Sequence, residues 1–220
     1  YPDVKFTAFG GLCLNRPVAV WNPDAVETSL KLGAKVIWLT HQHRREPLPQ
    51  KRQRALQGRR RHPGLARPWT SCRTFSPSSS STMLCWPPAT SAQKSASPVV
   101  EAARAAGVKK IVITHPEFWV VGMTPEQQAD IVRKYDVLLE SVYAQPVNGS
   151  YKINIPDNIA AMKAIGPEHF VLSTDSGQTV NPYWYESYTT YFKAVSEAFT
   201  PEQVRKMTHD NPAWLLDIDQ

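Results

Sequence analysis

The sequence predicts a single α/β domain built around a parallel β-sheet, either a barrel or a doubly wound sheet. Short apolar runs with strand character alternate with amphipathic helical runs over most of the chain. The strand-like runs are almost continuously apolar, which is typical of parallel strands that are buried on both faces. A chain of 220 residues is long enough to bury one sizeable core. A composition of 42% hydrophobic and 10% aromatic residues indicates a globular protein.

Five strands are expected, each a short apolar run between turn signals. They cover residues 4–15, 35–39, 109–114, 137–143 and 169–174. Capping signals mark the helices between them. The helix predicted over residues 22–33 has Asn22 as its N-cap and ends at Gly33, and the helix predicted over 124–135 begins at the N-cap Thr124. The remaining helices are expected at residues 99–107 and 155–166 and, near the end, from about residues 200 and 211.

Residues 41–98 carry a charge that the rest of the chain does not share. The whole chain has a net charge of +6, and this segment contains 11 of its 25 Lys and Arg residues but only one acid, Glu46. The remaining residues contain 14 basic and 18 acidic side chains and therefore have a net charge of −4. The run 51–62 resembles a nucleic-acid-binding patch, but no aromatic residue lies between its cations, so nucleic acid is not an expected partner.

A serine- and proline-rich tract at residues 69–91 interrupts the α/β pattern. Nearly sixty residues (40–98) separate the second predicted strand from the next predicted helix, and loops of this length are uncommon in compact domains. A serine codon of the form TCN, read two bases late, becomes a codon for Phe, Leu, Ile or Val. We therefore infer that residues 41–98 are read in a shifted frame; the alternative is a flexible Ser-Pro linker. Translated as written, the segment is predicted to be a basic, mobile excursion without a packing pattern.

Two polar side chains follow predicted strands at their carboxyl ends, where parallel sheets and barrels usually have their active and binding sites. His115 follows the third strand, and a histidine in this position can bind a metal ion or move a proton. The alternative is a histidine that only caps the strand. Asp175 follows the fifth strand, where it can bind a cation or take a proton from metal-bound water. The alternative is an Asx turn with Ser176 and Gly177.

Other side chains are weaker candidates. His41 and His43 have the spacing of a histidine pair on one face of a strand, but the basic segment begins directly after them, so we interpret the pair as accidental. His169 precedes its strand and is expected at the opposite end from the chemistry, and His209 is expected at a helix start. An aromatic group after Asp175 is expected to line a substrate pocket or, more commonly, to pack between helices and sheet. Its members are Tyr183, Trp184, Tyr185, Tyr188 and Tyr191.

The motifs ITHPE, LSTDSGQ and NPAWLL together resemble those of the amidohydrolase-like metal-dependent hydrolases. With GGLCLNRPV, NPDAVE and KVIWL, the chain resembles, more narrowly, an uncharacterised family of cytosolic TIM-barrel proteins within that group. The resemblance covers about residues 3–40 and 99–219. It implies a (β/α)8 barrel that binds one or two divalent metal ions at the strand tips, where a metal-bound water attacks the substrate.

Carried over residue by residue, the resemblance implies that His115 and Asp175 are both metal ligands and catalytic residues. Zinc or manganese is the metal that it implies. Glu117, Ser176 and Gln178 are then expected to contact a small-molecule substrate.

The expected barrel is incomplete. Its five strands are fewer than the eight of a closed barrel of this type, no strand with a paired-histidine motif precedes them, and the sequence opens with Tyr1 rather than methionine. We therefore expect a partial (β/α)8 TIM-type barrel without its first strands. It forms one domain over residues 1–220, in which 41–98 is an irregular, insertion-like segment. A chain truncated in this way is expected to have impaired activity.

The expected function is metal-dependent hydrolysis of a small ester, amide or lactone. Two alternatives stay open. One is a metal-free lyase or isomerase that uses His115 and Glu117 as acid and base. The other is a non-catalytic protein whose basic segment binds an acidic or nucleic-acid partner. Three irregularly spaced cysteines, the lack of a signal peptide and the lack of an apolar run of about 20 residues predict a cytoplasmic protein without a membrane partner.

Overall fold

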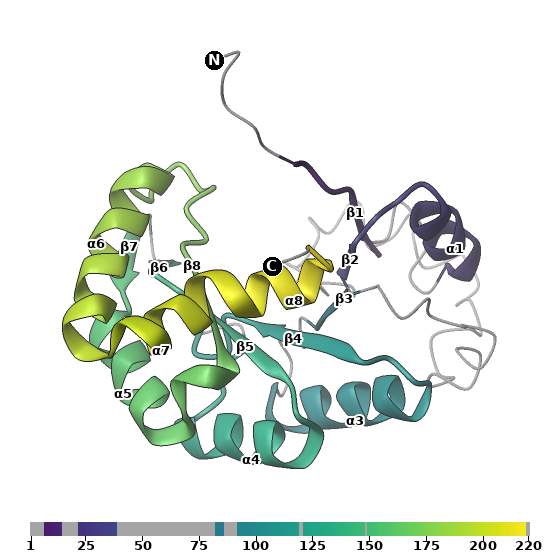
Figure 1. The fold of residues 1–220 in the computed structure, drawn as a ribbon, viewed down its shortest axis with the longest axis horizontal. Helices are drawn as coiled ribbons and strands as arrows, with labels where there is room; N and C mark the ends of the chain where they lie inside the picture. The colour runs from purple at the N-terminus through teal and green to yellow at the C-terminus, as the bar shows by residue number, and fades with distance from the viewer. Residues whose placement is uncertain are drawn as a thin grey trace, which may run out of the picture.

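The structure is a computed structural model that combines one parallel sheet with helices and a small hairpin (Figure 1). It describes residues 7–14, 22–38, 82–85, 92–118, 121–147 and 149–218. The parallel sheet contains β1 (Gly11–Cys13), β2 (Val36–Trp38), β3 (Thr82–Cys85), β4 (Lys110–Thr114), β5 (Leu138–Val142) and β8 (Phe170–Ser173). The hairpin pairs β6 (Ala144–Val147) with β7 (Ser150–Ile153).

The helices occupy the connections between strands and the carboxyl-terminal part of the described chain. They are α1 (Pro23–Lys31), α3 (Ala92–Ala105), α4 (Pro125–Tyr135), α5 (Ile155–Ile165), α6 (Trp184–Ala198), α7 (Pro201–Arg205) and α8 (Asn211–Leu216). A short 3-10 turn, η4 (Pro167–His169), precedes β8, and a π-helical turn, η5 (Lys206–Asp210), joins α7 to α8. None of the helices in the described ranges is long and apolar enough to cross a membrane.

The capping signals of the sequence act as predicted. The Asn22 side chain accepts a hydrogen bond from the backbone N–H of Ala25 at 3.0 Å and so begins α1. At the start of α4, the Thr124 hydroxyl accepts from the Gln127 N–H, and the Gln127 side chain accepts from the Thr124 N–H at 2.9 Å. Gly33, with a φ of 90°, follows α1 and supplies the left-handed residue that ends it. The helices predicted over 22–33 and 124–135 are therefore confirmed.

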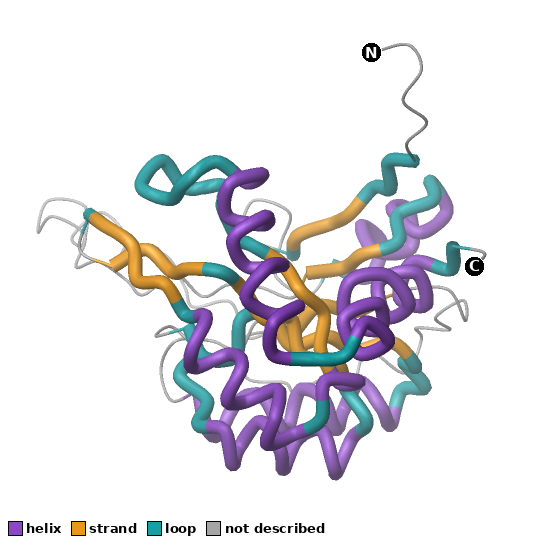
Figure 2. Tube along the Cα trace, turned by 60° about the vertical axis from the view of Figure 1, so that its left-hand side comes forward, coloured by secondary structure: helices purple, strands orange, loops and turns teal. Residues whose placement is uncertain are grey.

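The strand order identifies the kind of α/β sheet. The order is β1-β2-β3-β4-β5-β8, and every neighbouring pair is parallel. Each strand lies beside the preceding strand of the sheet, so the order never reverses as it does in a doubly wound sheet. Right-handed crossovers that always advance in one direction place their helices on one face. Figures 1 and 2 show α3, α4 and α5 along that face. The predicted α/β class with a parallel sheet is confirmed, and the described strands form no closed barrel.

The prediction that residues 41–98 lack a packing pattern is wrong where the structure describes them. Strand β3 lies between β2 and β4 and is parallel to both, and α3 begins at Ala92 rather than near residue 99. The four residues of β3 form a short, mostly apolar run. Their backbone groups pair with strands on both sides, and this pairing cannot be detected from the four residues alone. Residues 41–81 and 86–91 lie outside the described residues.

The two faces of the sheet differ in what covers them. Side chains that alternate toward the helices form the buried core, among them Ile111, Ile113, Leu139, Phe170 and Leu172. The register pairs Thr114 with Glu140 and Val142 with Ser173. The polar side chains of Thr114, Glu140 and Ser173 therefore alternate to the opposite face, toward its carboxyl edge.

Helix α8 covers the amino edge of the sheet. Asn211, at its start, donates from Nδ2 to the backbone oxygen of Phe170 at 2.7 Å, where β8 begins. Asp217, which follows the helix, pairs with the buried Lys110 at the start of β4. Its other carboxylate oxygen lies 3.7 Å from Nζ of Lys35, just before β2. Because the helix crosses the amino edge, the carboxyl edge is the end left for a functional site.

Candidate functional site

The carboxyl edge of β4, β5 and β8 brings together the two residues that the sequence predicts for chemistry. His115 follows β4 directly, and Asp175 lies two residues after β8. Both have a left-handed backbone, with φ of 34° and 50°, a strained conformation that is enriched at functional sites. Only β5 lies between the two strands, so their ends are about 10 Å apart across two strand spacings.

His115 is anchored in the protein interior. Its side chain is fully buried, and its backbone N–H donates to the backbone oxygen of Glu140 at 2.8 Å. The imidazole packs edge-on against the ring of Phe118, with ring centroids 4.7 Å apart. The ring is therefore fixed in place rather than free to sample solvent, as a positioned ligand or proton carrier requires.

Glu117 is a carboxylate whose surroundings disfavour its charge. Burial raises the pKa of Glu117 to about 7, and the charges of Glu140 and Asp157 add to this shift. Backbone N–H groups of Glu117 itself and of Val142 bind the carboxylate and hold the pKa lower than burial alone would. Within the described part of the chain, its Oε1 atom is buried and has no hydrogen-bond partner. Glu117 can therefore change protonation state near neutral pH.

Glu140 is a member of the site that the sequence analysis did not single out. It lies on β5, between Thr114 of β4 and Ser173 of β8. Burial raises the pKa of Glu140, nearby hydroxyl groups of Ser173 and Thr114 partly counter this, and the charge of Asp175 raises it further. A usable signal was present, because an acid inside the apolar run 137–143 is uncommon unless it has a partner.

Asp175 is held by a loop of side-chain hydrogen bonds. Gln178 donates from Nε2 to Oδ1 of Asp175 at 3.2 Å, and Asn181 donates from Nδ2 to the backbone oxygen of Asp175 at 2.9 Å and to Oε1 of Gln178 at 2.5 Å. Burial raises the pKa of Asp175, and the Gln178 hydrogen bond lowers it in part. In the described residues, the Ser176 hydroxyl and Oδ1 of Asn181 are buried without a hydrogen-bond partner. A bound water or ligand is therefore expected to supply their hydrogen bonds.

A buried polar layer supports the site from the helix side of β5. The Tyr191 hydroxyl lies 2.8 Å from Oγ of Ser141 and accepts a hydrogen bond from Nδ2 of Asn158 at 2.7 Å. Asn158 also donates to the backbone oxygen of Val142 at 2.7 Å. Burial raises the pKa of Tyr191 well above its usual value, and the charge of Glu117 adds to the shift. The layer therefore connects α5 and α6 to the backbone that binds Glu117.

The donor types of the site suit a divalent cation, but the set is incomplete. Imidazole and carboxylate are ligands that zinc and manganese accept. In the described residues, no three His, Cys, Asp or Glu side chains lie close enough together to hold a metal ion. His41, His43 and the basic run 51–62 lie outside the described residues. His169 precedes β8 and so lies at its amino end, as predicted. His209 lies in η5, just before α8 begins, in keeping with its prediction as a helix-start residue.

Replacing Glu117 with glutamine is expected to change how stability depends on pH. The raised pKa means that folding favours the protonated form, so the parent loses stability as the pH rises from about 4.5 to about 7. The variant has no such charge, so its stability relative to the parent should increase over this window, by on the order of 3 kcal/mol. Urea unfolding at several pH values, with a chelator present, measures the difference.

The matched control is Glu202→Gln. Hydrogen bonds at the start of α7 lower the pKa of the exposed Glu202, first from its own backbone N–H and then from Thr200. The glutamine variant should therefore lose stability relative to the parent as the pH rises. Parallel trends for the two variants would contradict the assignment of a disfavoured charge to Glu117.

Comparison with known proteins gives one family. The chain matches a family of unknown function, DUF6282, over residues 3–77 and 91–140, which together are more than half of its length. The chain belongs to the DUF6282 family. The DUF6282 match includes His115, Glu117 and Glu140 and ends before Asp175. No curated protein and no solved structure matches the chain.

Proposed function

We propose that this DUF6282 protein is a metal-dependent hydrolase of the amidohydrolase type that acts on a small ester, amide or lactone. The observation that carries the proposal is that a fixed imidazole, His115, and the carboxyl groups of Glu117, Glu140 and Asp175 all lie toward one edge of a parallel sheet. The carboxyl edge is where α/β enzymes of this kind place their catalytic groups.

We propose that the sheet corresponds to part of a (β/α)8 TIM-type barrel. Its strands follow one another in chain order and are all parallel, which is the arrangement that a barrel of this type requires. Helices along one face and polar side chains on the other correspond to the outside and the inside of such a barrel. The proposal retains the expected cytoplasmic location, with which the exposed free thiol of Cys13 is in keeping.

The roles of the residues follow from their surroundings. His115 and Asp175 would hold the divalent cation, zinc or manganese, which would supply a bound water of lowered pKa. Asp175 keeps Oδ1 on the Gln178 amide and takes a proton at Oδ2. Glu117, Ser176 and Gln178 contact the substrate. Burial is the main cause of the raised pKa of Glu117 and Glu140, and a bound cation would offset the smaller contributions that the charge of Glu140 makes to Glu117 and that of Asp175 to Glu140.

Because its set of metal ligands is incomplete, we expect the chain to bind the cation weakly and to turn over substrate slowly. A catalytic zinc site usually has three protein ligands. Since no such set is grouped in the described residues, we expect the cation to be lost during purification and to be needed in the assay.

A metal-free lyase or isomerase is the second candidate. The observation that favours it is again the lack of a grouped set of three metal ligands in the described residues, together with a buried Oε1 of Glu117 that is available as an acceptor. In that case His115 and Glu117 are the acid and the base. The third candidate, a non-catalytic protein that binds a partner through its basic segment, depends on residues outside the described ranges and stays a prediction.

Hydrolysis of 4-nitrophenyl acetate by the full chain tests the proposal. We expect slow turnover that increases with added zinc or manganese, stops with a chelator and falls at least about 100-fold in His115→Ala. His209→Ala, a histidine at the amino edge, should behave like the parent. Activity that survives the chelator but is lost in Glu117→Gln would instead favour the metal-free enzyme, and a chain without activity under any condition would contradict both.

A further inference from the structure

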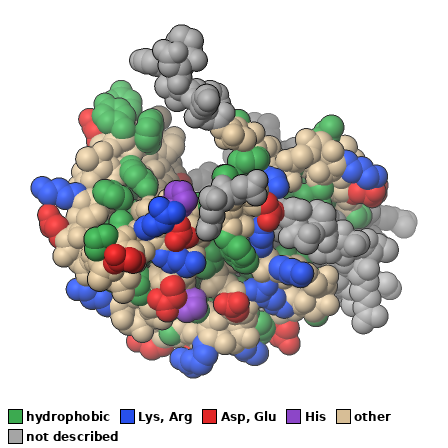
Figure 3. Space-filling model, viewed as in Figure 1, with side chains coloured by type: hydrophobic (Ala, Val, Ile, Leu, Met, Phe, Trp, Pro, Cys, Tyr) green, Lys and Arg blue, Asp and Glu red, His purple; other side chains and the backbone are tan. Residues whose placement is uncertain are grey.

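Three exposed aromatic side chains stand at the start of α6, next to the loop that carries Asp175. Tyr183, Trp184 and Tyr185 are 71%, 67% and 52% exposed. The rings of Tyr183 and Tyr185 stack with their centroids 5.9 Å apart, and the Trp184 ring meets Tyr185 edge-on at 6.0 Å. Figure 3 shows hydrophobic side chains gathered at this tip of the molecule. We call these three residues the α6 aromatic cluster.

Packing does not account for the α6 aromatic cluster. On the same helix, Tyr191 is fully buried and Tyr188 packs against the core, as the sequence predicts for the aromatic group. The prediction of packing is wrong for the three residues of the cluster, which belong to no part of the buried core. Adjoining aromatic rings left in water typically mark a surface that binds something.

A short loop with side-chain hydrogen bonds connects the α6 aromatic cluster to the carboxyl edge of the sheet. Asn181 donates to the backbone oxygen of Asp175, and Gln178 donates to its carboxylate. Tyr183 is only two residues beyond Asn181, so their Cα atoms lie within about 7 Å of each other. A ligand bound on the rings therefore lies beside the loop that holds Asp175.

Polar groups beside the α6 aromatic cluster select the charge of that ligand. In the described residues, Oδ1 of Asn181 and the Ser176 hydroxyl are buried without a partner, and an amide oxygen can only accept a hydrogen bond. The carboxyl groups of Asp175 and Glu140 lie close enough to repel each other. The surroundings therefore favour a hydrogen-bond donor and disfavour an anion.

We propose that the α6 aromatic cluster binds an aromatic group of the substrate, and that the substrate is neutral or cationic and carries an N–H donor, as an amine or amide does. This inference rests on the proposed function for the neighbouring site and specifies the substrate class. Stacking on Tyr183 and Tyr185 and cation–π contact with Trp184 supply the affinity. The N–H group then satisfies Oδ1 of Asn181.

Three probes with one ring system and different charge test the inference by isothermal titration calorimetry on the full chain. 2-Naphthylmethylamine is expected to bind at least tenfold more tightly than 2-naphthoate, with 2-naphthylmethanol between them. Trp184→Ala and Tyr185→Ala are expected to weaken amine binding at least fivefold. Phe192→Ala removes an exposed ring further along α6 and is expected to bind the amine like the parent.

The outcomes separate this inference from the hydrolase proposal. Equal affinity for the amine and the carboxylate, or parent-like amine binding by Trp184→Ala and Tyr185→Ala, would overturn the inference. Probe binding as expected in a chain that hydrolyses no ester would support the subsite and count against the hydrolase. Metal-dependent turnover without probe binding would overturn the subsite and leave the hydrolase standing.

Discussion

Replacing Asp175 with asparagine should reduce the metal-dependent turnover of 4-nitrophenyl acetate by at least about 100-fold, the usual worth of a positioned proton acceptor. Asparagine has nearly the same shape, tolerates the left-handed backbone at φ 50° and can still accept from Gln178 at Oδ1. It cannot take a proton and is a weaker ligand for a cation. Steady-state kinetics with saturating metal measure the loss, and thermal unfolding checks that the fold is retained.

Asp136→Asn is the matched control for this experiment. Asp136 also has a left-handed backbone, with a φ of 50°, but it ends α4 at an exposed position on the amino side of β5. The same chemical change there is expected to leave turnover unchanged. Turnover by Asp175→Asn within threefold of the parent would remove Asp175 from the proposed mechanism.

Replacing Asn158 with alanine should lower the free energy of unfolding by about 3 kcal/mol, because it removes two buried hydrogen bonds at once. The backbone oxygen of Val142 loses its Asn158 donor, and the Tyr191 hydroxyl loses one of its two partners in the described residues and keeps Ser141. Asn158 is 2% exposed, so water cannot replace the lost donor without opening the core. Chemical denaturation followed by far-ultraviolet circular dichroism measures the change.

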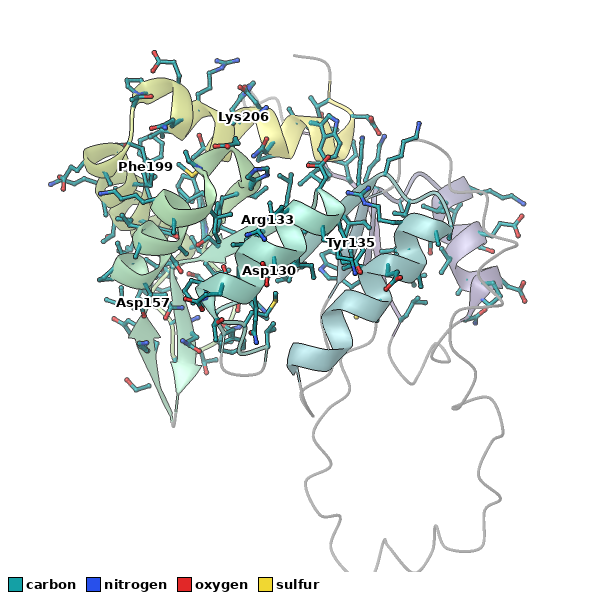
Figure 4. All side chains as sticks on the ribbon, turned by 90° about the horizontal axis from the view of Figure 1, so that it is seen from below. Asp130, Arg133, Tyr135, Asp157, Phe199 and Lys206 are labelled. Atoms are coloured by element: carbon teal, nitrogen blue, oxygen red, sulfur yellow. The ribbon has the colours of Figure 1, made fainter. Side chains whose placement is uncertain are left out.

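The neighbouring Asp157 provides the control on the same helix. Its carboxylate forms an exposed ion pair with Nζ of Lys152 at 3.1 Å, and Figure 4 labels it on α5. Exposed ion pairs contribute at most about 1 kcal/mol, so Asp157→Ala should cost much less than Asn158→Ala. Equal losses for the two variants would mean that the polar layer around Tyr191 adds nothing to stability.

Local signals account for the part of the fold that the sequence predicted well. The N-caps Asn22 and Thr124 bind donors only three residues away, so their effect is contained in a short stretch of chain. Strand β4 is buried at every position, and a run of that kind shows directly in the sequence. His115 was found in the same way, because a residue that follows such a strand necessarily lies at its carboxyl edge.

Contacts between distant residues account for what the sequence reading missed. Glu140 joins the site only because the register sets it beside Thr114 of β4 and close to Ser173 of β8, and register is not contained in any single run. Strand β3 was missed for the same reason, because its hydrogen-bonded pairing with β2 and β4 is what makes it a strand. The β6–β7 hairpin does not depend on distant contacts in this way. The dipeptide Asn148-Gly149 is a strong local signal for a hairpin turn.

The position of α8 has a consequence for how the protein is made. The carboxylate of Asp217 binds Lys35 and Lys110, so the residue that secures the amino edge is synthesised well after both of its partners. Contacts between residues so far apart in the chain slow folding, because the long segment between them must be ordered before they form. During synthesis the early strands are therefore exposed to chaperones and to neighbouring nascent chains until translation has passed Asp217.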